Sequence, residues 1–397
     1  MSSDSPVYYD PYRVDIAADP YPVFRRLREE APLYHNAEYD FYAVSRFADV
    51  QAGLADPATY LSGRGAILEM IKGGFRAPPG VFIFEDPPVH TVHRGVLKRV
   101  FTPGKMNALE PKIREFCRRC MDPLVGAERF DFVADIGAKV PMAVIGMLLG
   151  IPEQDQEAVR RRSDANLRTR AGQPMKVAEG SITGEGFAAY VDWRTRHPSD
   201  DLMTELLNAE FEDETGTIRR LTRQEVLVFC QVLAGAGNET TNRLIGWTGK
   251  VLADHPDPRR ELVKEPSRIP DAIEEILRYE GPAPHVSRYV ARDVELYGRK
   301  VPEGSAIMFL LGSANRDDRK YPDGDRFDIH RQTRPRHLSF GWGTHACLGA
   351  ALARVEGRVV LDEVLRRFPE WEVDAHEARL SSTSTVRGWE TLPVFVR

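Results

Sequence analysis

The sequence predicts a mainly α-helical single domain with a smaller β portion. Helical spacing of apolar residues recurs through most of the 397 residues, and neither an internal repeat nor a low-complexity linker divides the chain. Hydrophobic residues make up 42% and charged residues 28%, which is typical of a globular protein with a large core. We therefore expect one domain over 1–397, β-rich mainly at 35–65, 285–312 and 380–397, and helical elsewhere.

Composition excludes several classes of protein. The net charge is −5, whereas a nucleic-acid-binding protein normally carries a basic excess. The N-terminus has no basic flank before an apolar run, and the longest nearly apolar window, 140–152, is too short to span a bilayer. Four cysteines in this length do not make a disulfide framework. We expect a soluble, cytoplasmic protein with no membrane anchor and no nucleic-acid partner.

Four segments predict the main helices. Residues 107–125 carry an apolar stripe that includes Cys117 and Cys120. Residues 222–256 form a very long candidate, in which Thr222 and Glu225 match a capping box and the apolar middle indicates burial. The third candidate covers 267–280, with a proline near its start, and the fourth covers 350–368.

Strand signals are fewer. Residues 41–46 and 392–397 are short strand candidates, and 294–311 alternate around "VPEGS" (301–305), which predicts a hairpin that turns there. Two stretches rich in proline and glycine, 72–88 and 319–337, are predicted loops inside the domain.

The stretch "FGWGTHACLG" (340–349) places Cys347 among glycines just before a helix. A buried cysteine beside an ordinary turn is the simplest interpretation. However, glycines allow close backbone approach, and a helix N-terminus favours a thiolate, which is a nucleophile or a metal ligand. A zinc site lacks further ligands because Cys117 and Cys120 lie on a core stripe, and His345 nearby in sequence does not establish a catalytic dyad. A single thiolate fits haem iron best, since the macrocycle supplies four donors.

The same stretch, Phe340 to Gly349, resembles the haem-binding loop of the cytochrome P-450 monooxygenases. Other segments resemble family motifs in the same order: Asp86–Arg94, Ala236–Thr241, and Glu275 with Arg278 as the family's ExxR pair. The resemblance extends from "DPYPVFRRLRE" (19–29) to the C-terminal strands. It implies a single-domain cytochrome P-450 fold, with haem b between the long central helix and the cysteine loop with its helix.

The resemblance also implies roles for individual residues. Cys347 is expected to be the axial ligand of the haem iron, and Glu275 and Arg278 a structural clamp that positions the cysteine loop. Arginine pairs with carboxylates in a fork, which suits the haem propionates. The haem-binding set comprises His90, Arg94, Arg288, Phe340, His345, Cys347 and Gly349. His93 is interpreted as structural, and the role of His337 stays open.

Glu239 and Thr240 match the acid–alcohol pair that serves oxygen activation in the family. Thr240 is expected to steady the reacting oxygen and a water, and Glu239 to supply protons. The alternative is that the Thr240 hydroxyl only bonds to a helix carbonyl. Many relatives have Asp where Glu239 stands, and this difference does not alter the mechanism. Gly235 and Gly237 suggest a local bulge in the helix.

Motif position also predicts a substrate pocket with a mobile lid. The central helix and the segment before Arg288 are expected to contribute Val232, Gly235, Ala236, Thr240, Pro284 and Val286. The loop of residues 66–88 is expected to add Ile67, Leu68, Met70, Ile71, Phe75, Val81, Phe82 and Phe84. These side chains favour a hydrophobic lipid, steroid or terpenoid-like substrate. Residues that could instead anchor a polar end are Glu69, Lys72, Arg76 and His285.

The sequence therefore favours a monooxygenase that uses dioxygen. It has no dinucleotide motif or flavin domain, so we expect electrons to come from NAD(P)H through a separate ferredoxin. The alternatives are a peroxide-using haem-thiolate enzyme, which often lacks the acid–alcohol pair, and a haem-based ligand sensor or carrier, which usually has a partner domain. A basic face for ferredoxin is predicted from Arg114, Arg118, Arg119, Arg354, Arg358, Arg366 and Arg367, unless these are ordinary solvated helix surfaces.

Overall fold

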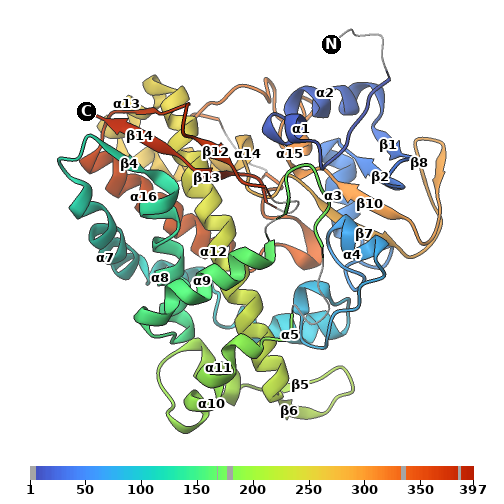
Figure 1. The fold of residues 1–397 in the computed structure, drawn as a ribbon. Coiled ribbons are helices and arrows are strands. Elements are labelled where there is room, and N and C mark those ends of the chain that lie inside the picture. Colours follow the sequence, from blue (N-terminus) through green and yellow to red (C-terminus); the bar gives the residue numbers. More distant parts are fainter. Residues whose placement is uncertain (1–5, 168, 177–181, 332–336, 383–385) are drawn as a thin grey trace.

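The computed structural model describes residues 6–167, 169–176, 182–331, 337–382 and 386–397. Within them the protein is a single domain, mainly helical with a smaller sheet portion, as predicted (Figure 1). Helices gather around one long helix, and the largest sheet lies to one side of them. Residues 332–336 of the second predicted loop and 383–385 of the last β-rich range lie outside the described residues.

The described α-helices vary from four residues to thirty-two. They are α1 (Val14–Ala18), α2 (Tyr21–Glu30), α3 (Phe47–Ala55), α4 (Leu68–Lys72), α5 (Val89–Lys98), α6 (Pro103–Asn107), α7 (Glu110–Met121), α8 (Val140–Leu149), α9 (Glu153–Leu167), α10 (Ala188–Arg196), α11 (Leu202–Asn208), α12 (Arg223–Asp254), α13 (Pro256–Lys264), α14 (Ile269–Tyr279), α15 (Leu311–Ala314) and α16 (Ala350–Arg367). Short 3₁₀ turns and one π-helical segment complete them, among them η1 (Phe82–Phe84), the π-helical η3 (Phe132–Gly137), η5 (Pro266–Arg268) and η6 (Gly343–His345).

The strands are short. They are β1 (Leu33–Asn36), β2 (Phe41–Val44), β3 (Tyr60–Leu61), β4 (Arg129–Asp131), β5 (Glu210–Glu212), β6 (Ile218–Arg220), β7 (Val286–Val290), β8 (Val294–Leu296), β9 (Arg299–Val301), β10 (Ala306–Phe309), β11 (Trp371–Val373), β12 (Arg379–Leu380), β13 (Trp389–Thr391) and β14 (Pro393–Val396).

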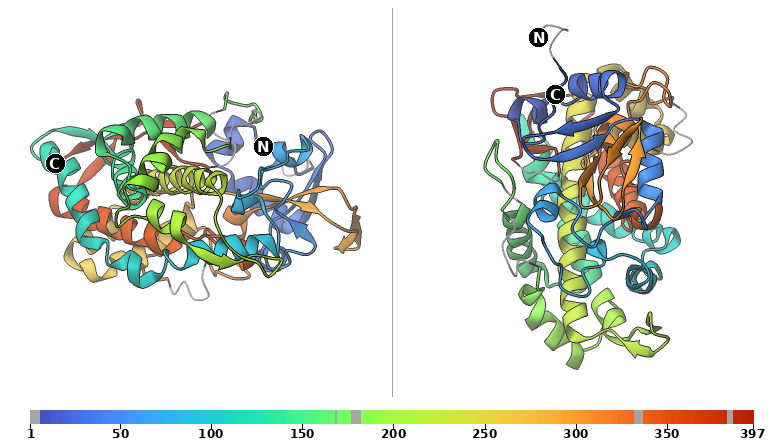
Figure 2. Two further views of the ribbon diagram at one scale, coloured as in Figure 1. Left: turned by 90° about the horizontal axis from the view of Figure 1, so that it is seen from below. Right: turned by 90° about the vertical axis from the view of Figure 1, so that its right-hand side faces the viewer.

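Helix α12 organises the fold. The hydroxyl of Thr222 accepts a hydrogen bond from the Glu225 backbone N–H, and the Glu225 carboxylate accepts one from the Thr222 N–H at 2.6 Å. The predicted capping box is therefore confirmed, and it satisfies donors that a helix start otherwise leaves unpaired. Most of the helix is buried, because α8, α9, α14 and α16 pack around it. Figure 2 shows it running the length of the molecule.

The largest sheet has the order β1-β2-β10-β7-β3. Strand β10 pairs in parallel with β2 and antiparallel with β7. The predicted hairpin that turns at 301–305 is wrong: β8 and β9 form the hairpin, and it turns at Tyr297 and Gly298. Both of these residues have positive φ (54° and 66°), as a two-residue turn that matches strand twist requires. The 301–305 segment instead carries the chain from β9 to the separate strand β10.

Several strands fall in ranges that were predicted to be helical. Strand β14 pairs with both β4 and β11, and β5 pairs with β6 in a separate hairpin. Each of β4, β5, β6 and β11 has three residues, which is too short to show the alternation that identifies a strand in a sequence.

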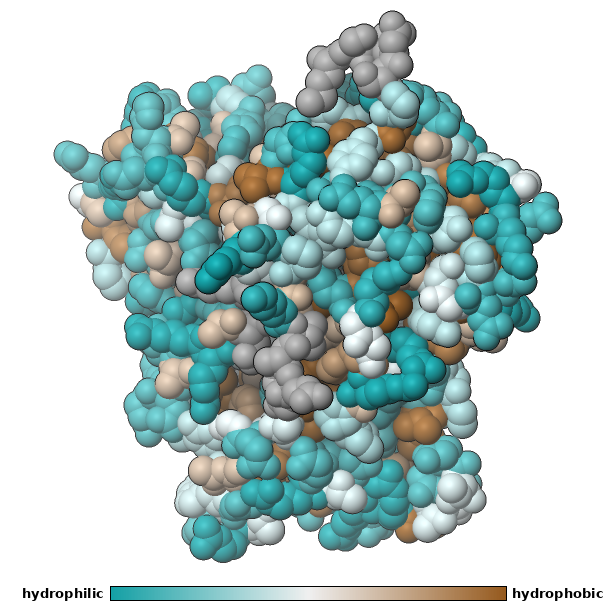
Figure 3. Space-filling model, turned by 45° about the vertical axis from the view of Figure 1, so that its right-hand side comes forward, coloured by the Kyte–Doolittle hydropathy of each residue, from teal (hydrophilic) through white to brown (hydrophobic). Residues whose placement is uncertain are grey.

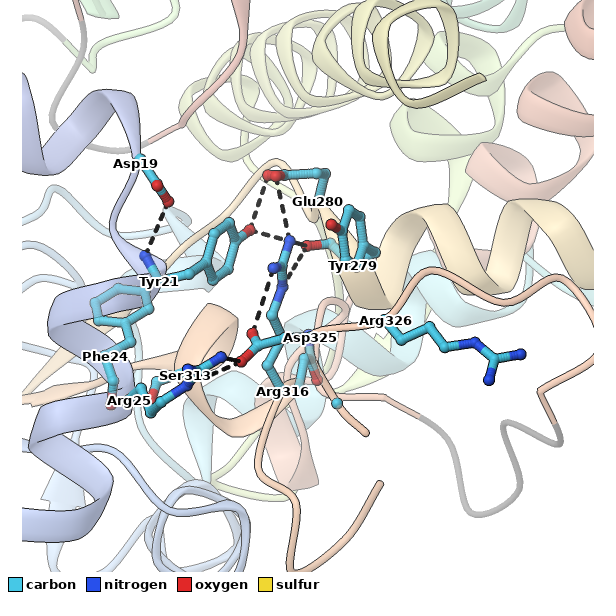
Figure 4. Close-up of polar contacts among 12 residues, drawn as sticks. Asp19, Tyr21, Phe24, Arg25, Tyr279, Glu280, Ser313, Arg316, Asp325 and Arg326 are labelled. Carbon is cyan, nitrogen blue, oxygen red and sulfur yellow. Dashed lines mark hydrogen bonds and ion pairs between the residues drawn. The ribbon is translucent and has the colours of Figure 1, made fainter. Parts of the chain in front are cut away.

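A buried cation joins the first helices to the end of α14. The Arg316 guanidinium carbon lies 3.2 Å from the ring centre of Tyr21 and 3.7 Å from that of Tyr279. Figure 4 shows its nitrogens directed at the Tyr279 carbonyl, at 2.7 and 3.1 Å, and at the Glu280 carboxylate, at 3.3 Å. The Tyr21 hydroxyl donates to the same carboxylate at 2.8 Å. These contacts fix α2 against the helix that carries the predicted ExxR pair.

One helical stretch, Phe132–Leu149, is long and apolar enough to cross a membrane by composition alone, but 67% of it is buried inside the fold. A core helix passes the same test, and this stretch packs against α12 and α7. Hydrophilic residues predominate on the face in Figure 3, with hydrophobic residues scattered among them.

Candidate active site

Residues 338–349 form a tight loop that ends at the start of α16. The Gly341 N–H donates to the Leu338 carbonyl at 2.8 Å, and the Cys347 N–H donates to the Phe340 carbonyl at 2.7 Å. Gly343 has a φ of +68°, and a β-carbon there would lie 2.4 Å from the Leu54 carbonyl oxygen. Only glycine meets both conditions without a shift in α3. The loop therefore holds Cys347 in a fixed position at a helix N-terminus.

The surroundings of the Cys347 sulfur suit a metal-binding thiolate. The residue is exposed, yet protein surrounds the sulfur closely enough that burial raises the pKa of its thiol. The backbone N–H groups of Gly349 and Ala350 hydrogen-bond the sulfur and act in the opposite direction, as do the charges of Arg94 and Arg354. A metal cation bound to the sulfur would favour its deprotonated form, the thiolate.

Four basic side chains converge beside this loop. His90 and Arg94 lie four residues apart on one face of α5, His345 ends η6, and Arg288 lies on β7. The His90 and His345 ring centres are 4.0 Å apart, and Arg94 donates to the Ala346 carbonyl. The structure thus brings together all four residues that were predicted to bind the propionates.

These four groups make no ion pair among the described residues. Both ring nitrogens of His90 and Nε2 of His345 are buried without a hydrogen-bond partner, and Arg94 and Arg288 make no ion pair there. Burial is the main cause that lowers the pKa of His90, to about 4, and the charge of Arg94 lowers it further. Burial also lowers the pKa of Arg288, to about 10. An anionic ligand would offset the charges of the two arginines and give the unpaired ring nitrogens a hydrogen-bond partner. The two carboxylates of haem b fit this cluster.

A second polar group supports the loop from its outer side. The Glu274 carboxylate accepts from Arg354 Nε at 2.5 Å and lies 3.3 Å from His337 Nε2. Burial would raise the pKa of Glu274, but the neighbouring His337 and Arg354 lower it to about 2. The Arg354 guanidinium lies 4.5 Å from the Phe340 ring centre. His337, whose role the sequence left open, thus holds the loop through Glu274.

The ExxR pair is fully buried. Arg278 donates to both oxygens of Glu275 at 2.7 Å, and it also donates to the carbonyls of Asn315, Gly324 and Arg326. Sequence analysis did not identify a second arginine that contacts Glu275: Arg331 Nε lies 3.3 Å from Glu275 Oε1. Arg331 lies in a predicted loop with several other arginines, and no sequence pattern distinguishes it from them.

Asn315 connects this pair to the cysteine loop. Its carbonyl accepts from Arg278 at 2.9 Å, its side-chain oxygen accepts from the Leu338 N–H at 2.6 Å, and its side-chain nitrogen donates to Ser339 Oγ at 2.7 Å. The Ser339 hydroxyl donates in turn to the Leu277 carbonyl at 2.6 Å. Hydrogen bonds through Asn315 therefore connect Arg278 to the cysteine loop, as the implied clamp requires. Sequence reasoning did not identify Asn315.

Glu239 and Thr240 lie in the middle of α12. The Thr240 hydroxyl donates to the Ala236 carbonyl at 2.8 Å, which is the bond that the alternative interpretation anticipated. Thr240 is nevertheless among the residues that line the cavity described next. Arg243 Nε donates to Glu239 Oε1 at 2.9 Å. The bulge predicted at Gly235 and Gly237 is not found, because α12 is continuous from Arg223 to Asp254. A β-carbon on Gly235 would meet nothing within 4 Å, so this glycine leaves open space beside the helix.

A cavity of about 720 Å³ borders this part of α12. Of the residues predicted to line it, the structure places there Ile67, Met70, Phe84, Val232, Gly235, Ala236, Thr240, His285 and Val286. Sequence reasoning missed the wall formed by α9 and the segment after it, because that region matches no motif. It contributes Val159, Arg162, Ser163, Ala165, Met175, Lys176, Ile182, Thr183, Glu185, Gly186 and Phe187.

Other residues predicted for the pocket do not line this cavity. Phe82 packs in the core, with its ring centre 5.5 Å from that of Phe229, and Pro284 lines a separate cavity of about 130 Å³. Phe75 packs edge-on against Phe84, and Lys72 forms an ion pair with Asp40. Apolar character alone does not separate a pocket wall from the core. The others that do not line the large cavity are Leu68, Glu69, Ile71, Arg76 and Val81.

His93 lies between two carboxylates away from the haem cluster. Its Nδ1 is 2.7 Å from Glu85 and its Nε2 is 3.3 Å from Glu225. Burial lowers the pKa of His93, but the hydrogen bonds to Glu225 and Glu85 outweigh it and raise the pKa to about 9. The charged imidazole therefore ties the loop before α5 to the capping box of α12, which agrees with its interpretation as structural.

Comparison with known proteins identifies the fold and the chemistry. The cytochrome P450 family profile matches residues 188–391. Cytochrome P450 123 of Mycobacterium tuberculosis is 38% identical over 399 aligned residues, which cover 99% of this chain and 98% of the relative. The structure of P450 EryK in complex with erythromycin B aligns with a TM-score of 0.85 at 32% identity, covering 96% of each chain. CYP109E1 from Bacillus megaterium, in complex with testosterone, aligns with a TM-score of 0.85 at 28% identity over 96% of this chain and 99% of the other.

The family profile covers more than half of the chain, and the mycobacterial relative aligns with nearly all of it. The chain therefore belongs to the cytochrome P450 family, the haem-thiolate monooxygenases that use haem b as cofactor.

Proposed function

We propose that this monooxygenase inserts one atom of dioxygen into a large hydrophobic molecule of lipid, steroid or terpenoid type. The observation that carries the proposal is the cavity of about 720 Å³ beside Glu239 and Thr240, whose wall is mostly apolar. Cavities of this size hold drug-sized ligands, and an apolar wall selects by shape and hydrophobic area. The relatives solved with erythromycin B and testosterone support a bulky substrate.

Substrate titration of the haem-loaded enzyme tests this proposal. A ligand that fills the cavity and displaces water from the iron shifts the Soret band. We expect steroids, terpenoids or long-chain lipids to shift it at micromolar concentration, and small aromatic acids to leave it unchanged. Tight, spectrum-shifting binding of a small carboxylic acid, with no response to any of the larger molecules, would overturn the proposed substrate class.

We also propose roles for the site residues. When haem binds, Cys347 would ligate the iron, and His90, Arg94, Arg288 and His345 would hold the propionates, because these side chains make no ion pair among the described residues. Bound haem supplies the iron at which dioxygen is reduced and cleaved. The N–H groups of Gly349 and Ala350 hold charge on the sulfur and so tune its donation to iron. Phe340, over which Arg354 lies, shields the same side of the loop.

Glu239 and Thr240 deliver the protons that the reaction consumes in this scheme. The overall reaction RH + O₂ + 2 e⁻ + 2 H⁺ → ROH + H₂O consumes two protons, and both must reach the oxygen atom that leaves as water. Thr240 lines the cavity, where its hydroxyl oxygen would accept a hydrogen bond, and Glu239 would pass protons toward it. The position of this pair at the cavity wall favours a dioxygen-using enzyme over a peroxide-using one.

Substitution Thr240→Ala is expected to uncouple the reaction. Without the hydroxyl, NADH oxidation continues while product formation falls and hydrogen peroxide is released. Parallel assays of NADH, product and peroxide measure the coupling. Thr241→Ala is the control, because Thr241 is buried in the same helix and does not line the cavity. Full coupling in Thr240→Ala would remove this residue from the mechanism.

A ferredoxin-type electron donor and a cytoplasmic location complete the proposal. The alignment of bacterial relatives over nearly the whole chain supports both. The basic face predicted for docking needs correction, because most of its arginines form ion pairs, for example Arg114 with Asp362 and Arg367 with Glu363. Among the described residues, Lys98 and Arg99 at the end of α5 and Arg118 of α7 are exposed cations without an ion pair. We place the docking site there.

A further inference from the structure

A second, smaller cavity adjoins the large one. Its volume is about 130 Å³, and the side chains of His285 and Val386 line both cavities, so these two residues form a shared wall. The remaining walls of the small cavity come from the N-terminal segment with α1, from the stretch after α9 and from the chain around β12. Glu239 and Thr240 line the large cavity and not the small one. The small cavity is therefore an annex of the large one that lies apart from this pair.

The N-terminal wall of the small cavity is apolar. It is formed by Tyr9, Tyr12, Ile16 and Phe24, which are at most 8% exposed, and Leu380 of β12 adds a further apolar side chain. An apolar space in a folded protein lacks the contacts that close packing would supply, and an apolar group that enters it restores them. These walls therefore favour a hydrocarbon group.

The one cation of the small cavity is already neutralised. Arg387 is the only described residue in its lining that carries a permanent charge. Its Nε and Nη2 donate to the carbonyls of Ala17 and Ala18, each at 2.7 Å, and its Nη1 pairs with the Glu280 carboxylate. A cation with these partners does not require an anionic ligand. The small cavity is therefore not a site for a carboxylate or a phosphate.

Two hydroxyl groups in the lining are engaged as well. The Thr169 hydroxyl and N–H both donate to the Ser382 carbonyl, at 3.0 and 2.9 Å. The Ser381 hydroxyl accepts from Arg243 Nη2 at 2.9 Å. The bonds of Thr169 also join the stretch after α9 to the chain after β12, and so fix two walls of the small cavity relative to each other. The cavity is therefore preformed, and the surface it leaves for a ligand is mainly apolar.

We propose that the small cavity is a subsite for the apolar end of an elongated substrate, a long-chain lipid that passes between His285 and Val386 into the large cavity. The proposal rests on the proposed monooxygenase function and narrows its substrate class. An apolar cavity of roughly 150 Å³ holds a group the size of benzene, so this one holds a short run of chain carbons. Because Glu239 and Thr240 line only the large cavity, the C–H bond that becomes C–OH lies within the chain and not at its apolar end.

The substitution Ile16→Trp tests the subsite, because Ile16 lines only the small cavity and an indole would fill it. The probes are straight-chain alcohols from decanol to octadecanol, titrated by the Soret shift of the haem-loaded enzyme. In the wild type the Kd should fall about fourfold for each further methylene that becomes buried. In Ile16→Trp the shorter alcohols should bind as in the wild type, and the longest should bind about tenfold or more weakly. Leu380→Trp, which fills the same cavity from β12, should have the same effect.

Two further variants are matched controls. Ile67 lines only the large cavity, so Ile67→Trp should weaken short and long alcohols alike. Val125 is 58% exposed and lines neither cavity, so Val125→Trp should change no affinity. The position of the new hydroxyl, determined by mass spectrometry, gives a second reading. In Ile16→Trp the apolar end is held back in the large cavity, and oxidation should move toward that end of the chain.

Identical dependence of the Kd on chain length in the wild type, Ile16→Trp and Leu380→Trp would overturn the subsite. Slower binding of every alcohol at unchanged Kd would also overturn it, and would identify the small cavity as a passage to the large one. A wild type that responds to steroids or terpenoids but to no long-chain alcohol would overturn the subsite and leave the proposed function standing. A wild type that neither binds nor hydroxylates any hydrophobic molecule would refute the proposed function, and the subsite with it.

Discussion

Replacing Cys347 with serine is expected to abolish the strongly red-shifted Soret band that thiolate-ligated haem gives after reduction in carbon monoxide. A serine hydroxyl does not ionise in this loop, so the N–H groups of Gly349 and Ala350 have no anionic sulfur to stabilise. Loss of the thiolate also removes the electron donation that favours O–O cleavage. Monooxygenase activity should therefore fall to background, even if Cys347→Ser still binds haem.

The other cysteines provide matched controls. Cys117 and Cys230 are buried, and burial raises the pKa of each thiol, to about 12 for Cys230. Such thiols remain protonated and pack as small apolar groups. The variants Cys117→Ala, Cys120→Ala and Cys230→Ala should keep the red-shifted band. If the band persists in Cys347→Ser, the ligand assignment is wrong.

Arg278→Leu is expected to destabilise the protein by about 3–5 kcal/mol, because it leaves Glu275 buried without its partner. It also removes the hydrogen bond to the Asn315 carbonyl, and with it the connection to Leu338 and the cysteine loop. Urea unfolding measures the stability, and the ratio of haem to protein after purification measures the second effect. We expect most of the purified variant to lack haem.

A control at an exposed ion pair tests whether the effects of Arg278→Leu come from the buried clamp or from the loss of any positive charge. Arg268 pairs with Glu265 at 2.8 Å in the η5 turn before α14, and both side chains are partly exposed. Arg268→Leu should leave both the urea unfolding midpoint and the haem content nearly unchanged. Equal effects of Arg278→Leu and Arg268→Leu would contradict the clamp.

The parts of the protein that sequence analysis predicted well are those in which neighbouring residues carry the signal. The capping box of α12 involves Thr222 and Glu225, three residues apart, and the cysteine loop is a continuous run of ten. The resemblance also brought together His90 and Arg288, which lie far apart in the sequence but belong to recognisable motifs.

The parts that were missed depend on contacts between distant segments. Asn315 links α14 to the cysteine loop, but it is an ordinary residue in its own segment. Phe82 was placed in the pocket because it lies in an apolar loop, whereas packing against Phe229 directs it into the core. In such cases the tertiary neighbours decide the role, and no local pattern records them.

The central claim is that this protein is a dioxygen-using monooxygenase of hydrophobic substrates. The most direct measurement supplies heavy-isotope dioxygen, NADH and a ferredoxin with its reductase to the haem-loaded enzyme, with a substrate selected by Soret titration. We predict one heavy oxygen atom in each product molecule and the other in water. Product oxygen that comes instead from unlabelled hydrogen peroxide or from solvent, with no heavy atom in the product, would contradict the claim.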